Sequence, residues 1–348
     1  MRGRVGAVIH ADRKVRVGIN GFGRIGRLFF RIAHARPDEF EVVQVNDLTN
    51  DPTMEYLLKY DSVFGRFDGK LEPGGPGEFF VDGRRTLVTS ERDPSAIEWG
   101  KLGVDVVLEA TGVFRSREKA ALHLAAGAKK VVISAPAKGA VDATVVVGVN
   151  HQALGPQHVI VSNASCTTNC LAPIAAVLHR EFGIRRGFMT TVHAFTNDQR
   201  LLDLPHDALR RARAAANNIV PTTTGAATAV GEVLPELAGR LDGISMRVPV
   251  PDGSLVDLTV DLNRRVTPEE INACLRAEAD GPLKGILDFT MDEIVSTDVL
   301  GEPCSALVDG ASTLVLDGDM AKVVAWYDNE WGYSNRCADL IAHLANLG

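Results

Sequence analysis

Cys166 has the position and the neighbours expected of a nucleophile. A stretch predicted as a strand (158–162) precedes it, and residues 169–182 follow with the apolar spacing of a helix. A thiol at the start of a helix meets the positive end of the helix dipole and free backbone N–H groups, which lower its pKa and stabilise an oxyanion. A cysteine before a helix is often only a buried apolar side chain, but here polar residues surround it, namely Ser165, Thr167 and Thr168. The segment therefore predicts a reactive thiol.

A thiolate requires a base or an ion-pair partner, which is most often a histidine. The chain has nine histidines. His193 stands near the end of a predicted strand (186–195), where the chain enters a polar loop, and His206 lies within that loop. The spacing favours His193 and leaves His206 as the alternative.

Three glycines follow the first predicted strand (14–20) with the spacing G-x-G-x-x-G: Gly21, Gly23 and Gly26. A predicted helix (27–35) and a second strand (41–46) come next, and Asp47 ends that strand. This order is typical of a dinucleotide-binding βαβ unit, with the pyrophosphate at the helix N-terminus and the acidic residue on the ribose hydroxyls. Asp47 would repel a 2′-phosphate, which favours NAD over NADP. The alternative is a tight turn with no ligand.

Strands alternate with helices up to about residue 150, which predicts an α/β domain with a doubly wound, mainly parallel sheet. Strands are expected at 86–90, 104–109, 130–134 and 144–149, a helix at 117–127 and a surface hairpin or loop at 72–83.

The later part predicts a second, α+β domain on a mostly antiparallel sheet. Further strands are expected at 245–250, 255–263 and 320–327, and helices at 209–217, 228–237, 268–279 and 334–347, with Thr267 as the N-cap of the helix at 268–279. We expect a mobile extension at 1–14, an NAD-binding domain at 15–165 completed by the helix at 334–348, and a catalytic domain at 166–333.

Composition limits the partners and the compartment. The 37 basic and 44 acidic side chains give a net charge of −7, which disfavours nucleic acid and anionic membranes. Five cysteines imply no disulfide framework, and the C-x₃-C spacing of Cys166 and Cys170 has no second pair, so no metal is expected. Cys170 is expected in the core. Apolar runs such as 145–149 are too short to span a membrane, and residues 1–14 do not resemble a signal peptide. A cytoplasmic protein is expected.

From about residue 15 to 347 the chain closely resembles the glyceraldehyde-3-phosphate dehydrogenase family. The matching motifs are VGINGFGRIG (17–26), ASCTTNC (164–170), PTTTGAA (221–227) and WYDNEWGY (326–333). The resemblance implies phosphorylating oxidation of D-glyceraldehyde 3-phosphate with NAD⁺ and inorganic phosphate to 1,3-bisphosphoglycerate and NADH, in glycolysis or gluconeogenesis. The route it implies passes through a Cys166 thiohemiacetal and thioester, with His193 as the base.

The resemblance also implies roles for residues at matching positions. It places the cofactor on Gly21, Gly23, Arg24, Ile25, Gly26, Asp47, Thr111, Ser134 and Asn329. It places the substrate's phosphate on Thr196 and Arg247, and inorganic phosphate on Ser165, Thr167, Arg211, Thr224 and Gly225. The segment 196–218 resembles a loop that reaches a neighbouring subunit, which implies a homotetramer. Leu204 and Pro205 resemble the NAD-preferring form.

Three alternatives remain open from the sequence. An erythrose-4-phosphate dehydrogenase would share the nucleophile but release a free acid without phosphate, and an NADP-linked homologue would differ in cofactor. A non-catalytic, NAD-responsive binding protein is the alternative from another class. Three departures from the family pattern do not touch the expected catalytic pair: Phe64, the extension at 1–14, and Val250 with Asp252-Gly253 after Arg247.

Overall fold

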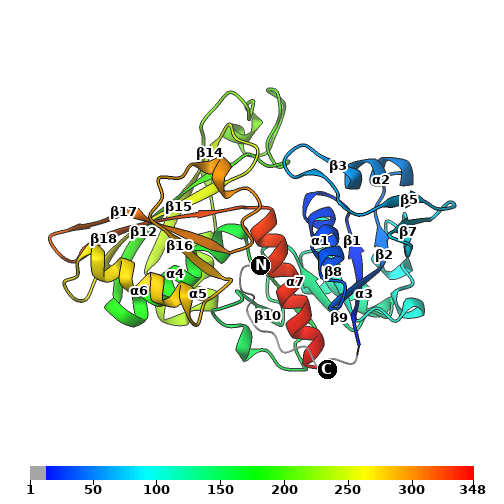
Figure 1. Cartoon of the computed structure of the whole chain (residues 1–348), viewed down its shortest axis with the longest axis horizontal. Helices are drawn as coiled ribbons and strands as arrows, with labels where there is room; N and C mark the ends of the chain where they lie inside the picture. The colour runs from blue at the N-terminus through cyan, green and yellow to red at the C-terminus, as the bar shows by residue number, and fades with distance from the viewer. Residues whose placement is uncertain (1–12) are drawn as a thin grey trace. The chain divides into compact units, whose positions relative to one another are not determined.

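The computed structural model describes residues 13–348, which form two compact units (Figure 1). The N-terminal unit consists of residues 13–145, His151–Ala164 and Ser334–Gly348. The C-terminal unit consists of Val146–Asn150 and Ser165–Tyr333. Residues 1–12, which make up most of the extension expected at 1–14, lie outside the described part.

The N-terminal unit is built on a nine-stranded sheet with the order β10-β11-β9-β8-β1-β2-β7-β6-β5. These strands are β10 (Ala143–Thr144), β11 (Ile160–Ser162), β9 (Lys130–Ile133), β8 (Val106–Glu109), β1 (Val15–Asn20), β2 (Phe40–Asn46), β7 (Arg84–Thr89), β6 (Glu78–Val81) and β5 (Leu71–Pro73). All pairs from β10 to β7 are parallel, and only β6 and β5 are antiparallel. The predicted doubly wound sheet is confirmed, and 72–83 forms the β5–β6 hairpin.

The strand order turns back between β1 and β8. From β1 the chain proceeds to β2 and β7 on one side of the sheet, and later to β8, β9 and β11 on the other. In open parallel sheets ligands bind at this reversal, beyond the carboxyl ends of the strands. Helices α1 (Arg24–Ala35), α2 (Asp51–Lys59) and α3 (Arg117–Ala125) belong to this unit, as does a separate hairpin of β3 (Tyr60–Asp61) and β4 (Gly65–Arg66).

The C-terminal unit is built on a seven-stranded sheet with the order β13-β14-β12-β15-β18-β17-β16. The strands are β13 (Val220–Thr223), β14 (Leu241–Val248), β12 (Ile184–Ala194), β15 (Ser254–Leu262), β18 (Met320–Tyr327), β17 (Ala306–Leu316) and β16 (Leu287–Thr290). Only β12–β14 and β16–β17 are parallel pairs, so the mostly antiparallel sheet is confirmed. Every second residue of β15 is buried, as expected where one face of a sheet is covered.

Three helices accompany this sheet: α4 (Cys166–Phe182), α5 (Ala226–Val233) and α6 (Pro268–Asp280). Helix α4 packs on β12, β15, β17 and β18, and most of its residues are buried. Thr267 caps α6 as predicted, with Glu270 completing a capping box. Among the helices described in residues 13–348, none is long and apolar enough to span a membrane.

Several local predictions are wrong. The strand expected at 144–149 ends at Thr144, because the Asn150 side chain accepts from Val146 N and Gly148 turns the chain with φ +90°. The helix expected at 228–237 is α5 followed by a short 3₁₀ turn that starts at Pro235. Helix α7 (Trp331–Asn346) begins three residues before the predicted start, and α2, β16 and β17 were not predicted.

The helix expected at 209–217 is also wrong. The chain forms only a 3₁₀ turn, η4 (Leu209–Ala212). Asp203 accepts hydrogen bonds from Arg213 Nε at 2.8 Å and from Ala214 N at 2.9 Å, so this carboxylate binds the groups that would continue the helix. Tertiary contacts of this kind outweigh a favourable helix propensity.

Candidate active site

A strained turn delivers Cys166 to the start of α4. Ala164 has φ +52°, a left-handed conformation that is uncommon for residues other than glycine and often marks functional sites. Ser165 is the N-cap, and its Oγ accepts from Thr168 N at 3.0 Å. The predicted location of Cys166 at a helix N-terminus is therefore confirmed. Cys170, one turn later, is fully buried, as expected.

His193 lies next to the thiol. It is the penultimate residue of β12, is only 4% exposed, and places Nε2 3.4 Å from Cys166 Sγ. His206 lies in the loop before η4, where its Nδ1 accepts from Ala208 N at 2.9 Å. Of the two histidines that the sequence left open, the structure brings His193 to Cys166.

Burial decides the charge state of this pair. It raises the pKa of the Cys166 thiol, and the opposing attraction of Arg247 is the smaller effect. Burial, together with the Arg247 charge, lowers the pKa of His193 to about 3. The backbone N–H of Thr167 at the helix start lowers the pKa as predicted, but desolvation outweighs it and the net shift is upward. At neutral pH these two shifts favour a neutral thiol and a neutral imidazole.

Nδ1 of His193 has both an acceptor and a donor beside it. His193 Nδ1 lies 2.7 Å from Ala194 O, which can only accept a hydrogen bond. Arg247 Nη1 lies 2.8 Å from Nδ1 and donates to the same carbonyl at 3.0 Å. We assign the hydrogen to Nδ1 on the basis of the shorter contact, to Ala194 O, and this leaves the lone pair of Nε2 directed at the thiol. Nε2 can then accept the thiol proton as a general base.

The ring of Tyr327 packs against the imidazole of His193. Sequence reasoning missed this contact. The Tyr327 ring meets the His193 ring edge-on, with 5.9 Å between centroids. Its hydroxyl lies 2.9 Å from Thr167 Oγ1 on α4 and 2.9 Å from Thr191 Oγ1 on β12. The hydroxyl therefore ties together the two elements that carry the thiol and the base. The Thr167 hydroxyl is engaged here, and the Thr167 backbone N–H at the helix start acts on the Cys166 thiol.

The groups expected to hold inorganic phosphate lie on two neighbouring helix starts. Thr168 Oγ1 donates to Ala226 O at 3.5 Å, which joins the first turn of α4 to the first turn of α5. Thr224 and Gly225 immediately precede α5, and Ser165 precedes α4. Free N–H groups at helix starts favour anions. Arg211, on η4, donates to Thr222 Oγ1 at 2.9 Å and also pairs with Asp198.

Arg247 lies beside His193, and Thr196 follows His193 by three residues along the chain. Arg247 pairs with His193 in the parallel register of β12 and β14, and Thr196 follows β12 by two residues. Arg247 Nε is buried and has no hydrogen-bond partner among the residues that the structure describes. A buried guanidinium donor without a partner is costly, so this position favours an anionic ligand.

The glycine loop of the N-terminal unit has the backbone that a pyrophosphate site requires. Gly21 has φ +93° and donates to Asn46 O at 2.8 Å. A methyl group on Gly26 would lie 2.1 Å from Gly21 O, so only glycine allows this packing. Gly23 is the N-cap of α1 without a side-chain cap, and a Cβ there would meet nothing within 4 Å. The first turn of α1, with Arg24 and Ile25, is therefore open to a phosphate, and the residues fit the expected cofactor.

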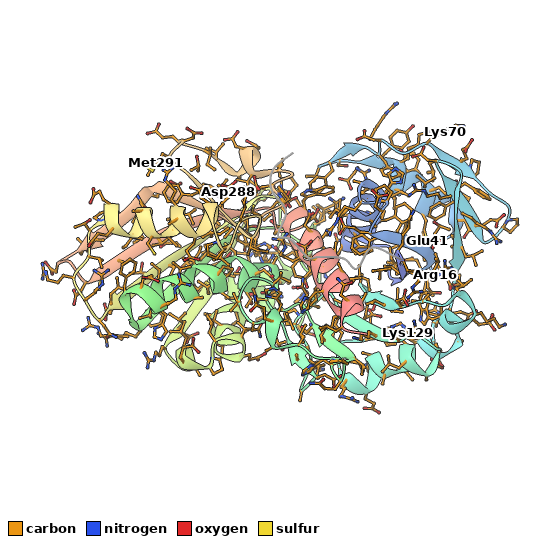
Figure 2. The ribbon with its side chains drawn as sticks, turned by 60° about the horizontal axis from the view of Figure 1, so that its bottom comes forward. Arg16, Glu41, Lys70, Lys129, Asp288 and Met291 are labelled. Atoms are coloured by element: carbon orange, nitrogen blue, oxygen red, sulfur yellow. The ribbon has the colours of Figure 1, made fainter. Side chains whose placement is uncertain are left out.

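The other expected cofactor residues meet at the same edge of the sheet. Asp47 follows β2, and its carboxylate accepts from Phe22 N at 2.7 Å. Thr111 follows β8, and Ser134 follows β9 and donates to Glu109 O at 3.1 Å. The opposite edge, where β1 and β2 begin, carries an ion pair of Arg16 and Glu41 at 2.6 Å (Figure 2). Asn329 belongs to the C-terminal unit, where it follows β18.

Glu109 organises this edge, and sequence reasoning missed it. The fully buried carboxylate accepts from Asn20 Nδ2 at 2.6 Å and from Thr111 N at 2.8 Å. His123 Nε2 lies 2.9 Å away, and Trp99 Nε1 donates to His123 Nδ1 at 3.1 Å, which places the histidine hydrogen on Nε2. The carboxylate thus fixes Thr111 at the point where the strand order turns back. A glutamate at the end of an otherwise apolar strand was the available signal.

The two loop glycines should fail in different ways. Gly23→Ala is expected to fold with a change in unfolding free energy below about 0.5 kcal/mol, yet to weaken NAD⁺ binding at least about tenfold, because the methyl group occupies space needed by the pyrophosphate. Gly26→Ala is expected to lose roughly 2 kcal/mol or more, because its methyl group meets backbone. Urea denaturation and NAD⁺ titration of both variants check this. Equal losses of stability would show that the glycines serve packing alone.

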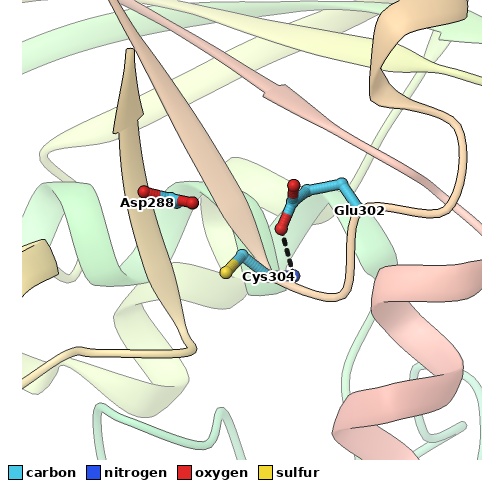
Figure 3. A group of neighbouring side chains, drawn as sticks. All are labelled: Asp288, Glu302 and Cys304. Carbon is cyan, nitrogen blue, oxygen red and sulfur yellow. Dashed lines mark hydrogen bonds between the residues drawn. The ribbon is translucent and has the colours of Figure 1, made fainter. Parts of the chain in front are cut away.

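A separate group of possible metal ligands lies on the C-terminal unit. Ligand atoms of Asp288, Glu302 and Cys304 lie within 4.8 Å of one another, and Glu302 accepts from Cys304 N at 3.2 Å (Figure 3). Acidic groups are commonly this close without an ion, and no described residue of the Cys166–His193 site belongs to the group. The cluster alone does not define a metal site, and the expectation of no metal stays a prediction.

The chain matches known proteins over nearly its whole length. Residues 15–117 match the model of the glyceraldehyde 3-phosphate dehydrogenase NAD-binding domain, and residues 165–329 match that of the C-terminal domain. The chain is 58% identical over 335 residues to glyceraldehyde-3-phosphate dehydrogenase of Geobacillus stearothermophilus, covering 96% of this chain and 99% of the relative. It is 56% identical to glyceraldehyde-3-phosphate dehydrogenase 1 of Bacillus subtilis, with the same coverage, and 55% identical to the Streptomyces coelicolor enzyme, covering 95% and 99%.

Proposed function

Because the chain belongs to the glyceraldehyde-3-phosphate dehydrogenase family, we propose that it oxidises D-glyceraldehyde 3-phosphate with NAD⁺ and inorganic phosphate to 1,3-bisphosphoglycerate and NADH. The observation that carries the proposal is the 3.4 Å contact between Cys166 Sγ and His193 Nε2 at the start of α4. A nucleophile beside a base, with free N–H groups at a helix start, is the arrangement that acyl transfer requires. The proposed reaction belongs to glycolysis or gluconeogenesis.

The first step is attack of Cys166 Sγ on the aldehyde carbon. His193 Nε2 takes the thiol proton as the carbon–sulfur bond forms, which suits a neutral thiol and a neutral imidazole. The Cys166 N–H and the protonated imidazole stabilise the oxyanion, and transfer of the proton to that oxygen gives a thiohemiacetal.

Oxidation and phosphate transfer follow on the same sulfur. NAD⁺, when bound, supplies the hydride acceptor. His193 takes the hydroxyl proton as the carbonyl re-forms, and the product is a thioester of Cys166. A phosphate oxygen attacks this thioester, the carbon–sulfur bond breaks, and the proton held on Nε2 returns to Sγ. The acyl phosphate leaves, and the site is ready for another aldehyde.

Two anion sites fit the two phosphates. Arg247 and Thr196 would hold the substrate's phosphate, since Arg247 Nε is buried and lacks a described partner. The helix starts of α4 and α5 would hold inorganic phosphate through Ser165, Thr167, Thr224 and Gly225, with Arg211 beside them. Hydroxyls, N–H groups and guanidinium are the donors that phosphate oxygens accept from.

Arg247→Leu is expected to lower kcat/KM for glyceraldehyde 3-phosphate by about 10²-fold, because charge-assisted hydrogen bonds are lost. Oxidation of unphosphorylated glyceraldehyde should change no more than a few-fold, about the scale of a lost neutral contact. Arg213→Leu is the matched control, since Arg213 is paired with Asp203 at 2.8 Å. Equal losses for both aldehydes would place Arg247 in another role.

We propose NAD rather than NADP as the preferred cofactor, because the Asp47 carboxylate lies beside the glycine loop. Asp47→Asn is expected to raise the KM for NAD⁺ roughly tenfold and to improve kcat/KM with NADP⁺, because it removes a charge that repels the 2′-phosphate. Asp38→Asn, at an exposed site of the same unit, is the control. An unchanged cofactor ratio would contradict this role of Asp47.

A homotetramer in the cytoplasm completes the proposal. Large apolar side chains are exposed around segment 196–218, which is unusual for a free surface: Leu201, Leu202, Leu204, Leu209 and Ile219. They support burial of this loop against another subunit. Light scattering of the purified protein tests the tetramer.

The deciding experiment follows NADH absorbance with purified protein, glyceraldehyde 3-phosphate and NAD⁺, with and without inorganic phosphate or arsenate. Phosphate-dependent NADH formation is the expected result. Activity without phosphate would favour the erythrose-4-phosphate dehydrogenase alternative, and activity with NADP⁺ alone would favour the NADP-linked one. A folded protein that is silent with both cofactors would be the NAD-responsive binding protein.

A further inference from the structure

Two buried carboxyl groups meet at the ends of neighbouring strands. Asp252 lies two residues before β15, and Asp328 follows β18 directly. Ser254 and Tyr327 are paired across these antiparallel strands, so the two segments are held side by side. Asp252 is 3% exposed and Asp328 is 1% exposed. Two carboxylates buried together would repel each other at great cost, so their protonation needs an explanation.

Asp328 has the partners of an anion. Its Oδ1 accepts from Glu330 N at 2.9 Å and Trp331 N at 2.6 Å, and its Oδ2 accepts from Gly301 N at 2.8 Å. Three backbone donors stabilise a carboxylate and oppose the effect of burial on its pKa. Trp331 is also the first residue of α7, where a negative charge is favourable.

Asp252 has the partners of an acid. Its Oδ1 accepts from Gly253 N at 2.9 Å, and its Oδ2 is buried without a donor among the residues that the structure describes. The side chain that acts most strongly on it is Asp328, which offers only acceptor oxygens when ionised. Burial and the nearby charges of Asp328 and Glu330 raise the pKa of Asp252 to about 9. Asp328 accepts from three backbone N–H groups and Asp252 from one, so the donors favour the charge on Asp328 and the proton on Asp252.

We propose that Asp252 is a positioning residue, which as a neutral carboxylic acid donates a hydrogen bond to Asp328 and so fixes the segment that carries Asn329. This role rests on the proposed function only in its effect on the cofactor. Ser254, two residues after Asp252, donates through Oγ to Asn329 Oδ1 at 2.6 Å and accepts from Ala194 N at 3.0 Å. Asn329 Oδ1 is thereby occupied, so Nδ2 is the group that would donate to the nicotinamide carboxamide of a bound cofactor.

Loss of the proton would act on the thiol as well. The charged groups that act on Asp252 are Asp328 and Glu330. A negative charge on Asp252 raises the pKa of the Cys166 thiol on α4. The neighbouring turn η6 (Ser296–Val299) carries Asp298, which accepts from Val295 N at 2.8 Å. These neighbours are anionic when ionised, so a second charge at Asp252 would push the two segments apart and raise the pKa of Cys166 further.

Urea unfolding as a function of pH tests the proton directly, without any activity. The folded chain holds a proton on Asp252 that the unfolded chain, with an ordinary carboxyl pKa, has released. Raising the pH therefore favours unfolding of the wild-type chain through this group. The ratio of unfolding equilibrium constants, wild type over Asp252→Asn, should rise about tenfold per pH unit between about pH 6 and 8.

Asp242→Asn is the matched control, because Asp242 is exposed and makes the same contact to its following residue, Gly243 N, at 2.8 Å. Its ratio to wild type should not change with pH. A constant ratio for Asp252→Asn would overturn the proposal, since Asp252 would then be ionised in the folded chain. An infrared band of a protonated carboxyl at neutral pH, absent in Asp252→Asn, should accompany the pH effect.

Kinetics test the positioning role. Asp252→Leu removes the donor and should raise the KM for NAD⁺ several-fold. Asp252→Asn keeps an N–H donor toward Asp328, so its KM for NAD⁺ should stay near the wild-type value. Wild-type activity should fall above about pH 9 relative to Asp252→Asn, as the Asp252 proton is lost. Equal KM values for the two variants would overturn the positioning role. A protein without dehydrogenase activity would refute the proposed function. The pH dependence of unfolding would still test whether Asp252 is protonated in the folded chain.

Discussion

Cys166→Ser is expected to lower kcat/KM for phosphate-dependent NADH formation by at least about 10⁴-fold, with NAD⁺ binding retained. A hydroxyl holds its proton far more tightly than a thiol, and the ester that it would form is less reactive toward phosphate than a thioester. The site that remains would bind substrate but could not form the covalent intermediate at a useful rate. Steady-state kinetics and NAD⁺ titration of the variant measure both parts.

Cys274→Ser provides the matched control for this prediction. Cys274 is half-buried on α6, and its thiol pKa is also raised by burial, yet no described residue of the Cys166–His193 site contacts it. This variant should keep activity within about twofold, the usual range of a substitution away from the site. A Cys166→Ser enzyme with more than a few per cent of wild-type activity would mean that the chemistry does not pass through this sulfur.

The sequence predicted the glycine loop and the position of the nucleophile, because each depends on a local requirement of a few consecutive residues. Gly21 is needed for a positive φ, and Ser165 is needed as a cap for α4. These requirements come from backbone geometry and appear as motifs. For the same reason the approximate starts and ends of β1, β2 and α4 could be predicted from composition and spacing alone.

Contacts between distant segments could not be predicted in this way. Tyr327 reaches Thr191 only because β15 lies between β12 and β18, and the pairing of Asp252 with Asp328 depends on the same strand order. The alternation of apolar residues predicts strands but does not fix which strand becomes whose neighbour. The pairing of Asp252 and Asp328 is therefore a product of topology.

The direction of the Cys166 pKa shift also could not be predicted from the sequence, for a different reason. The motif predicts that Cys166 lies at a helix start, and the positive end of the helix dipole there favours a thiolate. Burial is not visible in the motif, because it arises from packing around α4 and β12, and it raises the pKa of Cys166. Desolvation and the helix terminus act in opposite directions, so the sign could not be settled before the packing was known.

If the thiol and the imidazole are both neutral, His193 must remove the thiol proton as a general base, and not only orient a preformed thiolate. His193→Asn is expected to lower kcat/KM by roughly 10³-fold, which is the usual contribution of a general base. In the wild type the base is neutral at all pH values above its pKa of about 3, a value set first by burial and then by Arg247. Wild-type kcat/KM should therefore stay nearly constant from about pH 5 to 8, without a loss near the ordinary histidine pKa.

The variant should depend on pH in a different way. Without a base, attack requires thiolate formed by loss of the proton to solvent, and the pKa of Cys166 is raised by burial. Below that pKa the thiolate fraction increases about tenfold per pH unit, so kcat/KM of His193→Asn should rise with this slope. His206→Asn, at the other candidate position, should keep the flat profile and activity within about twofold of wild type. If His193→Asn kept the flat profile, the thiol proton would be leaving to another group, and the 3.4 Å contact would be one of packing alone.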